Sequence, residues 1–208
     1  MEEQDWANLS HYKEENLKLK SSSLNEQRIL FYGDSITEQW AEIVPEYFSE
    51  NLYINRGIGG QTTPQMLIRF RQDVIKLKPA VVIILAGTND IAGNTGPSTL
   101  EMILDNIISM VEMALANNIK VILASVLPVY EYPWAPGLEP ADKIVELNNM
   151  IKNYADKSGI TYLDYYSALV DERKGMREEY TTDGVHLNVK GYNKLIPLAE
   201  EAIAKVLK

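Results

Sequence analysis

The sequence predicts an α/β fold of the three-layer α/β/α type, in which one parallel sheet lies between two layers of helices. From about residue 28 onward, short apolar segments typical of strands alternate with longer segments of helical periodicity. The clearest strand, residues 80–86, is a continuous apolar run of the kind that helices cover on both faces of a parallel sheet. Strands that alternate with helices are joined by right-handed crossovers and therefore lie parallel. Because no linker or internal repeat is visible, residues 27–208 are expected to form one domain.

Five strands are expected, each a short apolar segment bounded by glycine, proline or polar residues. They are residues 28–32, 52–55, 80–86, 120–125 and 160–164. We expect the order 2-1-3-4-5 within the sheet, which is the flavodoxin-like arrangement. In that order the first strand lies between the second and the third.

Helices are expected between the strands, because apolar side chains there repeat at intervals of three and four residues. The longest such stripe runs over residues 100–115, and Ser98 is expected to start this helix, since it precedes Glu101 by the three residues of a capping box. Residues 1–26 are expected to form a helical arm on the outside of the domain, with no part in its chemistry. Further helices are expected at residues 62–77, 144–154 and 195–206.

The composition limits the partners that the surface can attract. Twenty basic residues against 29 acidic ones give a net charge of −9, which disfavours nucleic acid and anionic membranes. No apolar run is long enough to span a bilayer, so no integral membrane association is expected. The absence of cysteine excludes disulfides and a thiol nucleophile. We expect a cytoplasmic protein if the chain is complete, and a periplasmic or secreted one if a leader was removed.

Ser35 follows the first predicted strand, and its hydroxyl is a candidate nucleophile. A serine hydroxyl needs a base to take its proton, and His186 is the candidate base because the other histidine, His11, falls in the N-terminal arm. Asp183 stands three residues before His186 and could orient the imidazole if the segment makes a single turn. Two plainer interpretations stay open, namely that Ser35 is a helix N-cap and that Asp183 is a turn residue.

The loops after the first three strands should share one edge of the sheet, where ligands bind in folds of this class. These loops offer three hydrogen-bond donors for an oxyanion: the backbone N–H of Ser35, the backbone N–H of Gly60 and the side-chain amide of Asn89. Gly59 could replace Gly60 as the backbone donor.

His186 follows the fifth strand, so the residues before it must run back across the sheet to reach Ser35. This path is only a few strand spacings long, at about 4.8 Å each.

Other residues near this edge have less definite roles. Asp34 and Asp90 are expected to stiffen the loops rather than to catalyse, and Arg56 is a candidate contact for a polar substrate. Three aromatic side chains lie in the long connection after the fourth strand and could either form a wall of the substrate pocket or cover the core: Tyr130, Tyr132 and Trp134.

The sequence resembles the SGNH (GDSL-type) hydrolases in four blocks, which keep the order and spacing of that family from residue 28 to the C-terminus. The blocks are Gly33-Asp34-Ser35, a glycine at Gly60, Gly87-x-Asn89-Asp90 and Asp183-x-x-His186. The resemblance implies an esterase with a flavodoxin-like fold that uses no metal and no nucleotide cofactor. It also implies that Ser35 is the nucleophile, His186 the base and Asp183 its orienting carboxylate, and that Gly60 and Asn89 are oxyanion donors.

One position departs from the family pattern, because Ile36 stands where leucine is usual, and this aliphatic exchange leaves the catalytic groups unaffected. Residues 55–60 most resemble the platelet-activating-factor acetylhydrolase-like and carbohydrate acetylesterase-like members. The predicted function is therefore hydrolysis of short-chain esters, above all acetyl esters and including acetylated carbohydrates, through an acyl-serine intermediate. A small ester is the expected partner.

Other functions stay open. The same groups would suit a lysophospholipase or a thioesterase acting on lipids. A non-catalytic flavodoxin-like module could bind flavin or a dinucleotide, although Gly57-x-Gly59-Gly60 lacks the Gly-x-Gly-x-x-Gly spacing. A carbohydrate-binding relative without activity is less consistent with four intact blocks. The sequence predicts neither the alcohol part of the substrate nor the oligomeric state.

Overall fold

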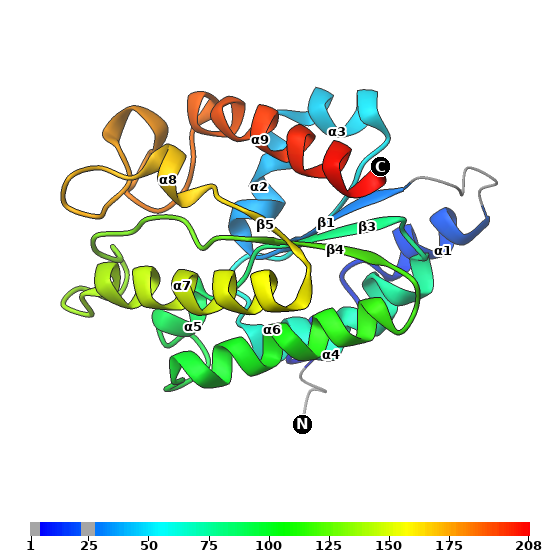
Figure 1. Ribbon diagram of the computed structural model, residues 1–208, viewed down its shortest axis with the longest axis horizontal. Coiled ribbons are helices and arrows are strands. Elements are labelled where there is room, and N and C mark those ends of the chain that lie inside the picture. The colour runs from blue at the N-terminus through cyan, green and yellow to red at the C-terminus, as the bar shows by residue number, and fades with distance from the viewer. Residues whose placement is uncertain (1–4, 22–27) are drawn as a thin grey trace.

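The computed structural model describes residues 5–21 and 28–208 of the chain. Five parallel strands within these residues form one sheet of order β2-β1-β3-β4-β5, which confirms the predicted order (Figure 1). The strands are β1 (Ile29–Gly33), β2 (Ile54–Gly57), β3 (Val81–Ile84), β4 (Lys120–Ala124) and β5 (Thr161–Leu163).

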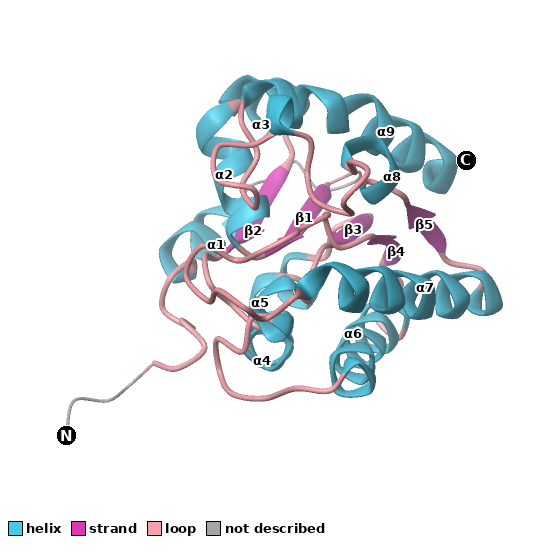
Figure 2. Ribbon diagram, turned by 90° about the vertical axis from the view of Figure 1, so that its left-hand side faces the viewer, coloured by secondary structure: helices cyan, strands magenta, loops and turns pink. Residues whose placement is uncertain are grey.

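Helices cover both faces of this sheet, so the predicted three-layer sandwich is confirmed (Figures 1 and 2). One face carries α4 (Thr63–Asp73), α5 (Thr88–Ile91), α6 (Leu100–Leu115) and α7 (Pro140–Ser158). The other face carries α2 (Ser35–Ile43), α3 (Pro45–Asn51), α8 (Tyr166–Leu169) and α9 (Val189–Leu207). Two short 3-10 helices, η1 (Ile75–Leu77) and η2 (Glu178–Tyr180), lie in the connections.

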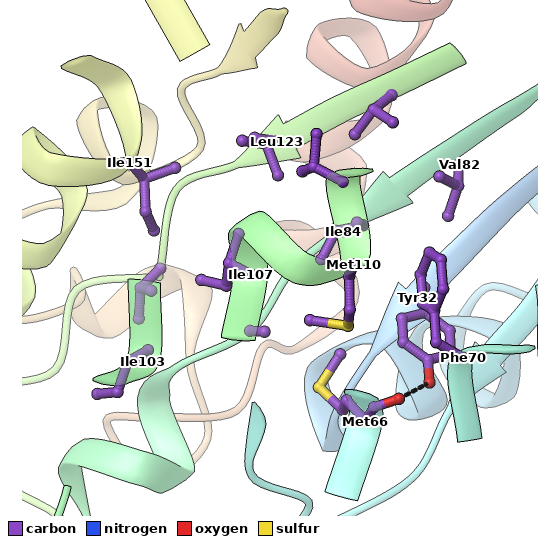
Figure 3. Packing of buried hydrophobic residues seen from close by; sticks show 14 of the residues in the cluster. Tyr32, Met66, Phe70, Val82, Ile84, Ile103, Ile107, Met110, Leu123 and Ile151 are labelled. Carbon is purple, nitrogen blue, oxygen red and sulfur yellow. Dashed lines mark hydrogen bonds between the residues drawn. The ribbon is translucent and has the colours of Figure 1, made fainter. Parts of the chain in front are cut away.

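The strands are buried on both faces, which explains their continuous apolar sequences. Side chains alternate along β1, so Tyr32 packs into the core on the α4 side while Phe31 packs into the core on the α2 side. Figure 3 shows the first of these cores, where the Tyr32 hydroxyl donates to the Met66 carbonyl at 2.6 Å. Both cores therefore pack against the sheet beneath the loops at its carboxyl edge.

Several helix boundaries differ from the expectation. Helices α7 and α9 extend beyond the expected residues 144–154 and 195–206 and begin at Pro140 and Val189. Helix α6 begins at Leu100, and its N-cap is Thr99, whose hydroxyl accepts from the Met102 N–H at 3.2 Å; the expected start at Ser98 is wrong. The helix expected over residues 62–77 ends at Asp73, and the chain then forms η1 before Lys78 adopts a left-handed conformation ahead of Pro79. The N-cap of α6 thus differs from the expected position by one residue, and after Asp73 the chain tightens into a 3-10 helix.

The N-terminal segment of the described chain contains helix α1 (Lys13–Ser21), which lies beside the β2 edge of the sheet (Figure 2). The remainder of the predicted arm, residues 1–4 and 22–26, lies outside the described residues. The boundary between an arm and a domain at residue 27 therefore stays a prediction. Over the described ranges, no helix has the length and apolar character needed to cross a bilayer.

Candidate active site

Ser35 is the first residue of α2, directly after the carboxyl end of β1. The N-cap of this helix is Asp34 rather than Ser35, because the Asp34 carboxylate accepts from the Ile36 N–H at 3.0 Å. The Ser35 side chain is therefore not used in capping. Its position at a helix N-terminus places it where the helix dipole favours negative charge.

Two glycines allow α2 to pack directly on the sheet at this point. Gly33 and Gly57 end β1 and β2 and face each other in the strand register. A Cβ atom at Gly33 would collide with the Thr37 side chain, and one at Gly57 would collide with the Glu38 backbone. Because any side chain would push the helix away, these glycines fix the height of Ser35 above the sheet.

His186 reaches Ser35 across 151 positions of sequence, with Ser35 Oγ and His186 Nε2 3.0 Å apart. The histidine lies in the segment between β5 and α9, which returns over the carboxyl edge of the sheet as expected (Figure 1). Tyr192, fully buried near the start of α9, donates from its hydroxyl to the Ile36 carbonyl at 2.8 Å. This contact ties the helix after His186 to the helix that carries Ser35.

Asp183 holds the imidazole from the other side, with 2.8 Å between Asp183 Oδ2 and His186 Nδ1. Its second oxygen, Oδ1, accepts from the backbone N–H groups of Val185 at 2.9 Å and His186 at 2.7 Å. Burial raises the pKa of Asp183, but the hydrogen bonds from His186 and Val185 outweigh it and leave the pKa below its ordinary value. Asp183 is therefore both the turn residue and the partner of the imidazole.

The loop after β2 carries the two glycines considered as backbone donors. The Gly59 N–H donates to Glu38 Oε2 at 2.8 Å and is therefore already engaged by a carboxylate. Gly60 has a φ of +74°, a left-handed conformation that glycine adopts without strain. Of the two, Gly60 is the better candidate for an oxyanion donor.

Asn89, in α5 after β3, is buried beside this loop. Its Nδ2 donates to the Gln61 carbonyl at 3.0 Å, and its Oδ1 accepts from Asn94 Nδ2 at 3.0 Å. Asn94 Nδ2 also donates to the Gly60 carbonyl at 3.1 Å. These partners fix which way the Asn89 amide points, and they leave it one further N–H to donate. Asn94 was not predicted from the sequence, because it is exposed and lies in no distinctive pattern.

Asp34 and Asp90 stiffen the loops, as expected, through hydrogen bonds to backbone. Asp90 accepts from the Thr63 N–H at 3.0 and 2.9 Å and thereby joins α5 to the start of α4. Burial raises the pKa of Asp90, and burial raises the pKa of Asp34 to about 7. At acidic pH a protonated carboxyl therefore lies next to Ser35.

Replacing Asp34 with asparagine should stabilise the protein at pH 8 but change its stability little at pH 4. The folded-state pKa of about 7 lies above the ordinary 3.8, so the folded protein binds the extra proton between these values. Wild-type stability therefore falls as the pH rises through this window, whereas asparagine keeps the cap and cannot ionise. Urea unfolding of both proteins at the two pH values measures this difference. An equal difference at both values would contradict the assignment.

The three aromatic residues after β4 separate into core and rim. Tyr132 is fully buried and bonded through its hydroxyl to Thr88, so it covers the core and does not line a pocket. The Trp134 side chain is 46 % exposed, and its ring centroid lies 6.2 Å from that of His186. Tyr130 is exposed beneath the Arg173 guanidinium and lines a cavity of about 520 Å³ that also contacts Asp183.

Arg56 does not contact the site, so the expectation of a substrate contact is wrong. Its side chain is buried, its Nε donates to Asn16 Oδ1 at 3.0 Å, and its guanidinium lies 4.4 Å from the centre of the Tyr12 ring. Arg56 thus binds the N-terminal segment. In a strand, neighbouring side chains point to opposite faces, and the sequence alone did not show which face Arg56 occupies.

We call the connection between β2 and α4, residues 58–62, the donor loop. Two buried polar residues were also not predicted from the sequence: Gln61, which belongs to this loop, and Arg69, which donates to the Gln61 side chain. Arg69 lies in the apolar stripe of α4, between Met66 and Phe70, and is fully buried. A charged residue in an apolar helical face is a signal that could have identified it. In residues 5–21 and 28–208, no group of three or more metal-binding side chains is arranged to hold an ion.

Comparison with known proteins shows which sequences and structures this chain is similar to. Residues 31–194 match the GDSL-like Lipase/Acylhydrolase family. The crystal structure of a candidate acylhydrolase from Bacteroides fragilis is 48% identical, with a TM-score of 0.96, over 99% of this chain and 100% of that one. Human platelet-activating factor acetylhydrolase IB subunit alpha2 is 28% identical over 190 residues, which are 88% of this chain and 79% of that protein.

A shorter match links the chain to the uncharacterized lipoprotein YqeF of Bacillus subtilis. It is 36% identical over 98 residues, which are 45% of this chain and only 40% of the lipoprotein. The family match, by contrast, extends from β1 into α9 and contains Ser35, Asn89 and His186. The chain therefore belongs to the GDSL-like lipase/acylhydrolase family.

Proposed function

We propose that this carboxylic ester hydrolase acts on short-chain esters, above all acetyl esters, through a covalent acyl-Ser35 intermediate. The observation that carries the proposal is the continuous hydrogen-bonded series from Ser35 Oγ through His186 to Asp183, with distances of 3.0 and 2.8 Å. This is the arrangement in which a serine hydroxyl becomes a nucleophile near neutral pH.

Acylation begins when Ser35 Oγ attacks the ester carbonyl carbon while His186 Nε2 takes the hydroxyl proton. The carbonyl electron pair moves to oxygen, and the resulting oxyanion accepts hydrogen bonds from the Ser35 N–H, the Gly60 N–H and Asn89 Nδ2. The oxyanion then collapses and expels the alcohol, which leaves with the proton from His186. Asp183 stabilises the imidazolium that exists between these two proton transfers.

Deacylation repeats these steps with water. His186 takes a proton from water as the hydroxide attacks the acyl carbon, and the same donors hold the second oxyanion. Its collapse breaks the bond to Ser35 Oγ, which regains the proton from His186. The products are a carboxylic acid and the free enzyme, so each turnover consumes one ester and one water.

The preference for acetyl groups is supported by the name of a relative. The human relative is an acetylhydrolase by name and shares 28% identity over 190 residues with this chain. The loop after β2 is held by Glu38 and Asn94, through Gly59 N–H and the Gly60 carbonyl, and these bonds hold the Gly60 N–H in place for the oxyanion.

A chain-length series of nitrophenyl esters tests the proposal. Purified protein should hydrolyse the acetate and butyrate with higher kcat/KM than the octanoate and decanoate, and Ser35→Ala should abolish all of these activities. Acetylated saccharides are then compared with a lysophospholipid and an acyl thioester. A maximum at long chains would identify a lipid acylhydrolase instead, and binding without turnover of any ester would contradict the enzyme altogether.

Trp134 is placed to contact the alcohol part of the substrate, because its half-exposed ring lies next to His186. Loss of an aromatic contact costs about 0.5–1.5 kcal/mol, so Trp134→Ala should raise KM for an acetylated saccharide about threefold to tenfold. The kcat for nitrophenyl acetate should stay within about twofold, and Trp134→Phe should keep most of the affinity. An unchanged KM in Trp134→Ala would exclude this contact.

A further inference from the structure

We propose that Gln61 and Arg69 are positioning residues for the oxyanion donors, and that the N-terminal segment, residues 5–21, supports them from outside. The inference rests on the proposed function, because it concerns how the groups of that reaction are held in place. The N-terminal segment, which was expected to have no part in the chemistry, would thereby support it indirectly.

Arg69 joins the ends of the two strands that carry the site. Its side chain is fully buried, and its Nη2 donates to the Gly33 carbonyl at 3.0 Å and to the Arg56 carbonyl at 3.0 Å. Gly33 precedes Asp34 and Ser35, while Arg56 precedes the donor loop. One guanidinium therefore fixes the spacing between the nucleophile and the oxyanion donors.

Gln61 extends this network to the donors themselves. It follows Gly60 directly, and its backbone carbonyl accepts from Asn89 Nδ2 at 3.0 Å. Its side-chain Oε1 accepts from Arg69 Nε, and its Nε2 donates to the Ala7 carbonyl at 2.9 Å. Gln61 is 2 % exposed, so these bonds are shielded from water. A single residue thus connects the two donor groups to Arg69 and to the N-terminal segment.

The charge of Arg69 is balanced within the same network. Asp73, also fully buried, accepts from Arg69 Nη1 at 3.2 Å. Asp73 in turn accepts from Asn16 Nδ2 of α1 at 2.7 Å. A buried ion pair is seldom more stable than apolar packing of the same volume, so its stabilising effect does not explain its presence. We attribute its presence instead to the other hydrogen bonds of Arg69, which reach the Gly33 carbonyl, the Arg56 carbonyl and the Gln61 side chain.

The N-terminal segment closes the outer side of this network. The Tyr12 hydroxyl donates to the Gly57 carbonyl, at the end of β2, and Tyr12 is itself buried. Asn16 links the segment to both Arg56 and Asp73, with distances of 3.0 and 2.7 Å. Together with the Ala7 carbonyl, these contacts hold the donor loop between the segment and α4.

The variant Gln61→Leu tests this inference, because leucine has a similar size and keeps the backbone carbonyl that accepts from Asn89. It loses the side-chain bonds to Arg69 and Ala7, so the donors should lose their fixed positions. A displacement of about 1 Å can cost about a hundredfold, and we expect kcat for nitrophenyl acetate to fall about 10- to 100-fold. KM and the midpoint of the pH–rate profile should stay unchanged, since ground-state binding and the base are not altered.

A double-mutant cycle with Asn89→Ala separates positioning from general damage. Asn89→Ala alone should lower kcat about 10²- to 10³-fold, as the loss of an oxyanion donor does. Because Gln61 is proposed to act on both Asn89 and Gly60, adding Gln61→Leu to Asn89→Ala should lower kcat by a smaller factor than Gln61→Leu does in the wild-type protein. Losses that multiply in full would overturn the inference. Tyr47→Phe is the matched control. It removes the hydrogen bond from the buried Tyr47 to Glu200, on the face of the sheet opposite to α4, and should keep wild-type kcat.

Two further variants cover the case in which Gln61→Leu does not fold. Gln61→Glu keeps the acceptor for Arg69 and should retain more activity than leucine, and Tyr12→Phe removes only the bond to Gly57 and should lower kcat about threefold at constant KM. Wild-type kcat in each of these variants would overturn the inference while leaving the proposed function intact. An inactive wild-type protein would instead contradict the proposed function.

Discussion

Replacing His186 with alanine should lower kcat for nitrophenyl acetate about a millionfold, a loss as large as that expected from removing the Ser35 hydroxyl. The imidazole is within 3.0 Å of Ser35 Oγ, and its removal leaves the hydroxyl without a base. In serine hydrolases that use this arrangement, loss of the base costs about as much as loss of the whole catalytic group set, roughly 10⁶-fold. Steady-state kinetics with a sensitive chromogenic ester measures the loss.

The matched control is His11→Ala, which removes the other histidine of the chain. His11 is partly exposed, and its Nε2 lies 4.0 Å from Glu38, so its loss should change kcat by less than about threefold. Added imidazole should restore part of the activity to His186→Ala and none to Ser35→Ala. Activity in His186→Ala within about tenfold of wild type would remove His186 from the mechanism.

Asp183→Asn should lower kcat about 10⁴-fold with little change in thermal stability. The asparagine oxygen can still accept from the backbone N–H groups of Val185 and His186, so the turn should persist. Its amide nitrogen, however, takes the place of the oxygen that lies 2.8 Å from His186 Nδ1. A donor there favours the tautomer in which Nε2 carries the hydrogen, and that nitrogen can no longer take a proton from Ser35.

Asp164→Asn is a suitable control for this change. Asp164 follows β5 and accepts from the Ser167 N–H at 3.0 Å, so it is also a carboxylate that closes a turn. Its replacement should leave kcat within about twofold of wild type, because it lies outside the set of groups that act on the ester. Equal losses in both variants would show that damage to a turn, not the wrong tautomer, causes the effect.

The fold was predictable because its main signals are periodic. Apolar runs such as residues 80–86 and the stripe over residues 100–115 report burial directly, and short crossovers restrict the strand order. The position of Ser35 follows from the same reasoning, because the end of a parallel strand lies at the ligand-binding edge. The approach of His186 was a geometric expectation, and the structure brings the two side chains together.

Partners within the site were less predictable, because they depend on packing between distant segments. The choice between Gly59 and Gly60 depends on Glu38, twenty-one positions away from Gly59, which engages the Gly59 amide. Arg56 points toward the N-terminal segment, whose position no local pattern revealed. Tyr132 and Trp134 share one loop, yet one is fully buried and the other is half-exposed.

Covalent labelling of Ser35 by a fluorophosphonate tests the central claim most directly. Ser35 Oγ should attack phosphorus and expel fluoride, which adds one phosphonyl group to the intact protein and to the peptide that contains Ser35. Labelling should be absent in Ser35→Ala and strongly slowed in His186→Ala, because the attack needs the activated hydroxyl. The account would be contradicted if the folded wild-type protein stayed unlabelled, or if the Ser35→Ala variant were labelled to the same extent as the wild type.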